Sequence, residues 1–558
     1  MNRRTSLLVI TLALPTLAAA QNTPGAGRLL RETAPPSAGP GIRPSPLVTP
    51  QRVPVDSSAA AGTIPVKAIR ITGNTVIPTE ELRELVASAE GRNLTLNDLR
   101  LLAYRISLAY EARGYTLTTA YVPAQTITDG VVTIAVQEVR LGATRLYNYS
   151  DVSDSVLRRY LRHVPANRPI STPVLEDALL RLREVPGLQT SVILEPGAAP
   201  GTTELSVGSP PVKALSGSVN LDNAGAETTG TYRLGVGAQL ASPLGQGDRL
   251  AVQGLTSLDS GQGLRYGRVA YDYALGGRGL RIGAGYSHLS YELGQNFKEL
   301  DASGTADVAQ LWLSRPLIRS RTTSVDARLA YDHRDLDDRS EATFTFNPRR
   351  LQTLALGVSA GRHDEFMGGG YTAGSVTVGY SQVDIRDAIA ALQDAASARV
   401  ADGAGKLEAQ AERTQTLFGP LSLYLRANGQ LAGGNLDSAD QIGATGPYAV
   451  RAYAQGELYG DEAALFTAEL RYRLPLPVDY GYWQAVAFYD QATVWLAKDP
   501  WQSGDNQRTL GGAGLGLRCN LGNAWSARAD AAWRTLGGRP QASSGDTPQV
   551  WASLGYAF

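Results

Sequence analysis

The sequence is poor in the residues that build thiol chemistry and helical membrane anchors. Its 558 residues include one cysteine, Cys519, and two methionines. A single cysteine excludes an intramolecular disulfide framework and a cysteine-based zinc cluster, and few thiols suit an oxidising compartment. The 52 Lys and Arg balance the 52 Asp and Glu, so no net charge points to nucleic acid or to an anionic surface. No apolar run is long enough, at about 20 residues, to predict a membrane-spanning helix.

The first sixty residues divide into two segments that we expect to have no fold of their own. Residues 1–20 have the layout of a secretory signal peptide, with two arginines, a short apolar run and three alanines before Gln21. We therefore expect the mature chain to cross the inner membrane. Residues 21–63 are rich in Pro, Ala, Gly and Ser, which predicts an extended linker. Within it, residues 28–32 are expected to form one helical turn and no more.

The next two segments, residues 64–138 and 139–209, repeat one order of elements. The first is expected to have a strand at 66–73, helices at 79–90 and 94–114, and strands at 115–122 and 131–136. The second is expected to have a strand at 139–147, helices at 151–163 and 172–185, and strands at 188–194 and 203–207. Each segment therefore predicts a small α+β domain whose helices cover one face of a sheet.

From residue 210 the helical period gives way to short alternating runs that are separated by Gly, Asp and Asn and often end in Tyr or Trp. About 350 residues divided into about sixteen strand-plus-turn units leave ~22 residues each, enough for a 9–11-residue membrane strand and its connection. Residues 210–558 therefore predict an all-β transmembrane barrel of about 16 antiparallel strands. Residues 385–414 are rich in Ala and charge, and we expect a long surface loop with some helix there.

The last ten residues, 549–558, alternate strictly between the two faces of a strand and place two aromatics, Tyr556 and Phe558, on the apolar face. A soluble protein has little reason to expose such an edge. A closed barrel pairs its last strand with its first and turns an apolar face to lipid. A strand ending on Phe also resembles the insertion signal of bacterial outer-membrane barrels, which implies that the barrel-assembly machinery reads Tyr556 and Phe558.

Several motifs in order resemble one family. Residues 69–77 (IRITGNTVI), 113–115, 121–125 and 128–130 are similar to a POTRA domain, and residues 220–225 and 243–248 to the first barrel strands of two-partner secretion transporters. This is the ShlB/FhaC/HecB group of haemolysin secretion and activation proteins. The resemblance implies two periplasmic POTRA domains before a barrel in outer-membrane lipid. It also implies type V secretion, the recognition of a large exoprotein by its N-terminal secretion domain and its export through the barrel.

The family's central motif is Val-Arg-Gly-Tyr on a loop that folds back into the barrel. Here it reads Val450-Arg451-Ala452-Tyr453, and a second motif, aromatic-x-Asp, matches Phe488 and Asp490. The resemblance implies that Arg451 and Asp490 meet in the lumen and lock the loop tip. A charge on a barrel strand belongs on the lumen side in any case, since facing lipid costs ~2 kcal/mol or more. The alternative is therefore an ordinary lumen Asp490 and an exposed loop Arg451 that do not meet. If position 452 required positive φ, alanine there would carry about 1 kcal/mol of strain and hold the loop less tightly.

The sequence offers no catalytic constellation, so we expect neither an enzyme nor a cofactor. Residues 333–335 (His-Arg-Asp) imitate a kinase triplet, but no phosphate loop accompanies them, and we expect them at a strand end. The four histidines are scattered, which gives a metal site no support. Two rival functions stay open. A barrel-assembly insertase of the same superfamily usually carries more POTRA domains, and a passive porin would need none.

Overall fold

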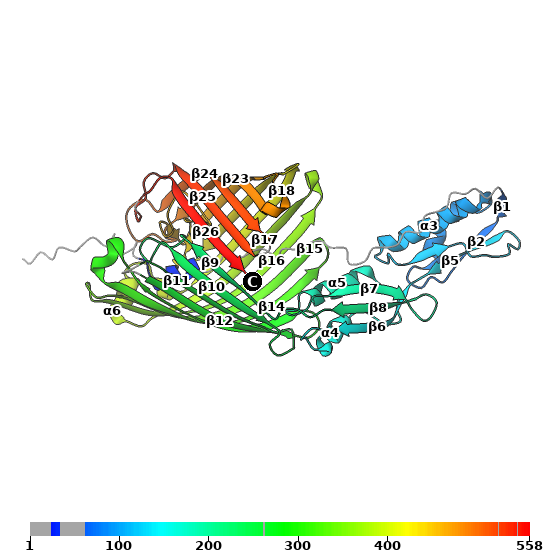
Figure 1. Cartoon of the computed structure of the whole chain (residues 1–558), viewed down its shortest axis with the longest axis horizontal. Helices are drawn as coiled ribbons and strands as arrows, with labels where there is room; N and C mark the ends of the chain where they lie inside the picture. The colour runs from blue at the N-terminus through cyan, green and yellow to red at the C-terminus, as the bar shows by residue number, and fades with distance from the viewer. Residues whose placement is uncertain (1–23, 34–61, 260–262, 523, 544) are drawn as a thin grey trace, which may run out of the picture.

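The computed structural model describes residues 24–33, 62–259, 263–522, 524–543 and 545–558. In these ranges the chain forms a closed barrel and two small α+β units, which precede it in the sequence and lie in a row beyond one end of it (Figure 1). The expected signal peptide, residues 1–20, lies outside the described residues, as does most of the expected linker. None of the described helices is long and apolar enough to cross a membrane.

The first unit, residues 63–137, packs its helices on a three-stranded sheet in the order β2-β5-β4. Its elements are β1 (Thr63–Val66), β2 (Ala68–Thr72), α2 (Thr79–Glu84), the 3₁₀ turn η2 (Ala87–Ala89), β3 (Arg92–Thr95), α3 (Leu96–Ala112), β4 (Thr119–Tyr121) and β5 (Val131–Gln137). Helix α3 begins at a capping box between Thr95 and Asp98. The strand expected at 115–122 is shorter, because the Tyr115 N–H donates back to the Tyr110 carbonyl at 2.9 Å and residues before 119 stay in a turn.

A buried carboxylate, Glu138, ties the end of this unit to the turn after β2. It accepts the main-chain N–H of Thr75 at 2.6 Å and of Val76 at 2.8 Å, together with the hydroxyls of Thr75 and of Tyr110. Burial disfavours the charged form of Glu138. The hydrogen bonds from Thr75 and Val76 outweigh burial and hold the pKa of this carboxyl below its ordinary value.

The second unit repeats the strand–helix–helix–strand–strand order that β2, α2, α3, β4 and β5 have in the first unit, and it has a core of its own. Its elements are β6 (Arg140–Asn148), α4 (Asp154–Leu161), α5 (Thr172–Arg183), β7 (Ser191–Pro196) and β8 (Thr202–Ser209). Strand β8 lies between a parallel β6 and an antiparallel β7. The helices bury Leu157, Tyr160, Leu179 and Leu182 against this sheet. The expected α+β character of the N-terminal region is therefore confirmed.

Sixteen strands among the described residues close into one antiparallel barrel, as the sequence predicts. In chain order they are β9 (Leu215–Asp222), β10 (Arg233–Ala241), β11 (Arg249–Ser257), β12 (Gly263–Leu275), β13 (Leu280–Glu292), β14 (Ala302–Arg319), β15 (Thr323–Ser340), β16 (Thr345–Asp364), β17 (Gly370–Ile385), β18 (Ala404–Phe418), β19 (Leu421–Ala432), β22 (Glu462–Arg473), β23 (Tyr482–Trp495), β24 (Gln507–Leu521), β25 (Trp525–Leu536) and β26 (Gln549–Ala557). The last strand, β26, pairs with the first, β9, so that no sheet edge remains.

The expectation of a surface loop over residues 385–414 is only half right. The loop and its helix α6 (Ala388–Ala395) occupy residues 386–403, whereas Ile385 ends β17 and residues 404–414 belong to β18. In β18 the outward positions are Leu407, Ala409 and Ala411, and charged or amide side chains alternate with them toward the lumen. Small outward residues weaken the apolar signal, so the strand reads as a polar segment although its period is two.

An eight-residue helix, α1 (Ala26–Thr33), lies inside the barrel (Figure 1). The sequence predicts one turn at most, and this expectation is wrong. Ala26 and Leu29 are fully buried against inward-facing residues of β13, β14 and β15, among them Leu289 and Ala306. The helix is stable there because the barrel supplies the apolar partners that its own Pro- and Ala-rich surroundings lack.

Candidate functional site

The long connection between β19 and β22, residues 433–461, folds into the lumen, and we call it the lumen loop. Its two arms meet in a short ladder between β20 (Ile442–Gly443) and β21 (Tyr459–Gly460). Beyond that ladder the tip carries Val450, Arg451, Ala452 and Tyr453, each no more than 2 % exposed. The loop tip is therefore packed against the wall of the barrel.

Arg451 and Asp490 are in direct contact inside the barrel. The Arg451 Nε donates to one Asp490 carboxylate oxygen at 2.7 Å, and its Nη2 donates to the other at 2.9 Å. Asp490 stands on β23, where Thr467 of the neighbouring strand also donates to it at 2.9 Å. The Phe488 ring lies under the guanidinium, with its centroid 3.4 Å from the Arg451 Cζ. The two-pronged geometry is the strong form of an arginine–carboxylate pair, and the ring adds a cation–π contact.

A second carboxylate, Glu469 on β22, connects Arg451 to a wider network. It accepts Arg451 Nη1 at 2.8 Å and Arg518 Nη2 at 2.8 Å, and it forms an ion pair with Arg471. The Arg451 main-chain carbonyl accepts the indole N–H of Trp551 on β26 at 2.8 Å. The tip is thus held by side chains from several strands rather than by one pair.

Ala452 does not have a positive φ, so the strain foreseen for a non-glycine residue at this position is not present. Its methyl group faces Gly512 of β24, and a Cβ at Gly512 would collide with it. The next residue, Tyr453, donates its hydroxyl to the carbonyls of Leu536 at 2.5 Å and of Gly538 at 3.1 Å. The tip tolerates alanine because the facing strand position is a glycine.

The base of the lumen loop is fastened on the opposite wall. Asp440 accepts Arg334 at 3.0 Å, and Asp437 pairs with Arg349 at 2.7 Å. Arg334 is the middle residue of the His-Arg-Asp triplet, which lies within β15 and not at a strand end as we expected. Its role is to hold a loop, which gives that motif a structural explanation.

A further tether joins the lumen loop to residues 541–543, between β25 and β26. The buried carboxylate of Glu457 accepts the main-chain N–H of Gln541 at 2.7 Å and of Ala542 at 2.9 Å. Glu457 is therefore a further attachment of the lumen loop, in addition to the Arg451 tip and the Asp437 and Asp440 base.

Helix α1 packs directly on the lumen loop. At Gly27 a Cβ would come within 2.8 Å of the main chain of Ala439, so only glycine allows this approach. Arg31 donates to the Asp440 carbonyl at 2.9 Å and to Glu408 of β18 at 3.1 Å. Glu32 accepts the hydroxyl of Tyr459. The helix and the loop share contacts along their length, so displacing one would release polar groups of the other.

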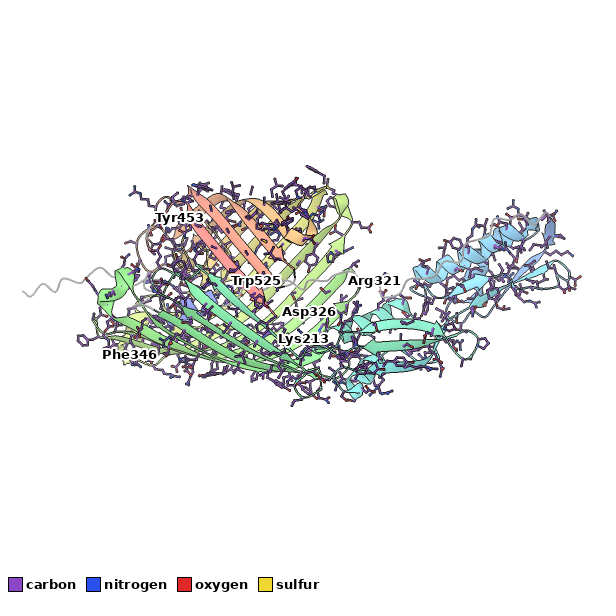
Figure 2. All side chains as sticks on the ribbon, viewed as in Figure 1. Lys213, Arg321, Asp326, Phe346, Tyr453 and Trp525 are labelled. Carbon is purple, nitrogen blue, oxygen red and sulfur yellow. The ribbon has the colours of Figure 1, made fainter. Side chains whose placement is uncertain are left out.

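The aromatic end of β26 lies at the closing seam. Phe558 exchanges two main-chain hydrogen bonds with Gly217, both at 2.9 Å, and Tyr556 packs on Trp525 with ring centroids 4.7 Å apart. Figure 2 labels Trp525 near this seam and Tyr453 nearer the opposite end of the barrel. Tyr556 and Phe558 are therefore remote from the contact between Arg451 and Asp490.

Sequence reasoning missed Glu469, Arg334, Glu457 and helix α1. Glu469 could have been found from the sequence, because it lies with Thr467 and Arg471 on one face of a strand. A charge on a barrel strand is costly on the lipid side, and this argument places Glu469 in the lumen as it does Asp490. The others depend on partners that are distant in the chain. Within the described ranges, no group of three or more His, Cys, Asp or Glu side chains is arranged to hold a metal ion.

Two protein-family models match this chain. The model for the haemolysin secretion/activation protein ShlB/FhaC/HecB covers residues 201–519, which is more than half of the chain. The model for the ShlB-type POTRA domain covers residues 64–138.

Known proteins similar to the chain are outer-membrane and heme transporters. The heme/hemopexin transporter protein HuxB of Haemophilus influenzae is 26 % identical over 424 residues, which cover 74 % of this chain and 73 % of HuxB. The outer membrane transporter CdiB of Escherichia coli is 24 % identical over 510 residues, covering 86 % and 81 % of the two chains. The solved structure of E. coli CdiB superposes with a TM-score of 0.72 at 20 % identity, over 92 % of this chain and 94 % of that one. CdiB of Acinetobacter baumannii gives 0.63 at 20 % identity, over 95 % and 96 %. These superpositions show the same fold.

Proposed function

The chain belongs to the haemolysin secretion/activation family of outer-membrane transporters, and on that premise we propose that it recognises a large exoprotein in the periplasm and exports it. Its barrel lies in the outer membrane, and its α+β region lies in the periplasm. The proposal is that the POTRA domains capture the unfolded N-terminal secretion domain of the exoprotein, and that the chain then threads the lumen.

The observation that carries this proposal is the content of the lumen. A passive porin needs an open water-filled channel, whereas here α1 and the lumen loop occupy the interior and are fastened by ion pairs. Two of these pairs, Arg334–Asp440 and Arg451–Asp490, are buried, so opening them is costly unless an entering polar chain supplies new partners for the released charges. A lumen obstructed by polar, reversible contacts supports a translocator that opens for a substrate.

Exposed sheet edges of the two units support recognition by strand addition. Strand β4 is an edge of the first sheet and β7 an edge of the second. Beside β4, helix α3 exposes Leu101, Tyr104 and Leu108, which share one face at helical spacing. An extended segment could pair with the edge and set apolar side chains on this stripe.

The energy for export would come from the far side of the membrane. Folding of the exoprotein at the cell surface removes the threaded chain from equilibrium, so the transporter itself needs no nucleotide. We further propose that the barrel-assembly machinery inserts the protein into outer-membrane lipid by reading Tyr556 and Phe558.

Calorimetry on the fragment 62–209, which contains both hydrophobic cores, tests the recognition step. The fragment should fold alone and bind the N-terminal region of the exoprotein encoded beside the transporter. Replacing Leu101 and Leu108 by serine should weaken binding about tenfold, the effect of 1.4 kcal/mol. Leu85→Ser, which removes another exposed leucine away from the stripe, should not. A folded fragment that binds nothing at high micromolar concentration would rule out recognition by the POTRA domains.

A further inference from the structure

Helix α5 of the second unit is joined to the first unit at its N-terminal end. The Thr172 N–H donates to the Gly114 carbonyl at 2.8 Å, and the hydroxyl oxygens of Thr172 and Thr116 are 2.7 Å apart. A Cβ at Gly114 would meet the Pro173 ring at 2.9 Å, so the two units approach as closely as the glycine allows. Leu117 of the first unit packs against the core of the second. This joint is a specific contact and not a loose linker.

Near its other end, α5 places a buried arginine against the barrel. Arg181 is 8 % exposed, and its Nη1 donates to the carbonyls of Arg278 at 2.8 Å and Pro316 at 2.7 Å. The pairing of β14 with β15 shifts register between Pro316 and Ile318, so Arg181 binds at a bulge, where the ladder is interrupted. Arg278 lies in the preceding periplasmic turn. One guanidinium therefore connects α5 to two separate parts of the barrel rim.

Neighbouring contacts between the second unit and the barrel bring the contact region to three consecutive periplasmic turns. Glu184 pairs with Arg319 at 2.5 Å, and Glu176 pairs with Arg321 at 3.0 Å. On the first turn, the Ser153 N–H donates to the Gly245 carbonyl at 2.8 Å. Figure 2 labels Arg321 near the place where the barrel meets the second unit.

We propose that α5 is a strut that holds the recognition region in one orientation over the mouth of the lumen, and that Arg181 is its positioning residue. The inference deepens the proposed function and rests on it. A captured segment held at a fixed place below the lumen has a far higher effective concentration at the mouth than one on a freely swinging arm. The guanidinium of arginine has five N–H donors in a planar fork and can hold several carbonyls at once, whereas the lysine ammonium is one compact charge.

The first test separates capture from transfer. In full-length transporter, Arg181→Ala should bind the exoprotein's N-terminal region within twofold of wild type, but secretion should fall at least tenfold. Arg181→Lys should secrete at an intermediate level. The matched control is Arg183→Ala, which removes an exposed arginine from the same helix and should leave both unchanged. Heat-modifiable mobility confirms that each barrel is assembled.

Three outcomes would overturn the inference or its premise. Wild-type secretion by Arg181→Ala would show that the residue does not position the arm. A parallel loss of binding and secretion would show that it only supports the fold of the unit. Absence of binding in the wild type would overturn the proposed function.

A disulfide across the first joint provides a second test. Thr116→Cys with Thr172→Cys, in a Cys519→Ala background that removes the sole native cysteine, places two sulfurs within bonding reach. If α5 is a rigid strut, oxidised and reduced transporter in proteoliposomes should export equally. Thr116→Cys alone is the control. Export that stops on oxidation and returns on reduction would show that the joint must bend, and would refute the proposal.

Discussion

Separating Arg451 from Asp490 should unlock the tip of the lumen loop without unfolding the barrel. Arg451→Ala removes the two-pronged contact and the bond to Glu469. Breaking a buried pair commonly costs 3–5 kcal/mol because one charge is left alone. Here Asp490 keeps the Thr467 hydroxyl, and Glu469 keeps its other arginines, so we expect about 2–3 kcal/mol. At 1.4 kcal/mol per tenfold, the ratio of locked to unlocked loop falls roughly 30- to 150-fold.

The assay compares wild type, Arg451→Ala, Asp490→Ala and the double mutant. For each genotype, secretion of the exoprotein, heat-modifiable mobility and protease cleavage of the loop would be measured. Both single mutants should secrete less and expose the loop while keeping the folded mobility. The double mutant should be little worse than either one, since the second change removes a group that has already lost its partner.

A matched control removes the same chemistry elsewhere in the barrel. Arg413 and Asp364 form an equally bidentate pair, at 2.8 and 2.9 Å, but join β18 to β16 with about a quarter of each side chain exposed. Asp364→Ala should therefore secrete normally. Strictly additive losses in the double mutant, or normal export by both single mutants, would refute the role of the pair as a lock.

Three further predictions follow from separate contacts. Deleting Phe558 removes the hydrogen bonds that end the closing seam, so assembled barrel should drop sharply; full levels with unchanged gel mobility would contradict this. The depressed pKa of Glu138 means that its stabilisation is complete above the ordinary carboxyl pKa, near 4.3, and is lost as pH falls through the folded pKa. Denaturant unfolding of the fragment 62–209 should thus show stability falling below about pH 4.5, and Glu138→Gln should flatten that dependence and cost about 1–3 kcal/mol at neutral pH; an unchanged pH profile would contradict it. Gly512→Ala should displace the loop tip and lower export because its Cβ meets the methyl of Ala452, and adding Ala452→Gly should restore export; a double mutant no better than the single would contradict this.

The barrel and the two α+β units could be predicted because their signals are local. Strand β26 alternates Val550 and Leu554 outward with Trp551 inward, as its sequence period of two requires. Thr95, Asp98 and the glycine after α3 likewise mark a helix start and end within a few residues. Strand β18 was missed in part because its outward residues are small, although the same period is present.

The candidate site, in contrast, depends on contacts between residues that are distant in the chain. Contact between Arg451 and Asp490 was expected from a resemblance, since nothing in the spacing of two residues 39 positions apart requires them to meet. Helix α1 could not be expected to pack, because Leu29 acquires its apolar neighbours from barrel strands that come far later in the chain, such as Leu289 of β13. The tolerance of Ala452 depends on Gly512, which only the folded barrel places opposite it.

The sequence by itself determined which segments are strands, which are helices and which strand faces are apolar, because side-chain period and turn residues act between neighbours in the chain. Only the tertiary structure decided which charges meet in the lumen, which segment fills it and how α5 is held between the first unit and the barrel. Those contacts depend on closure of the barrel, which brings residues such as Arg334 and Asp440 together across the lumen.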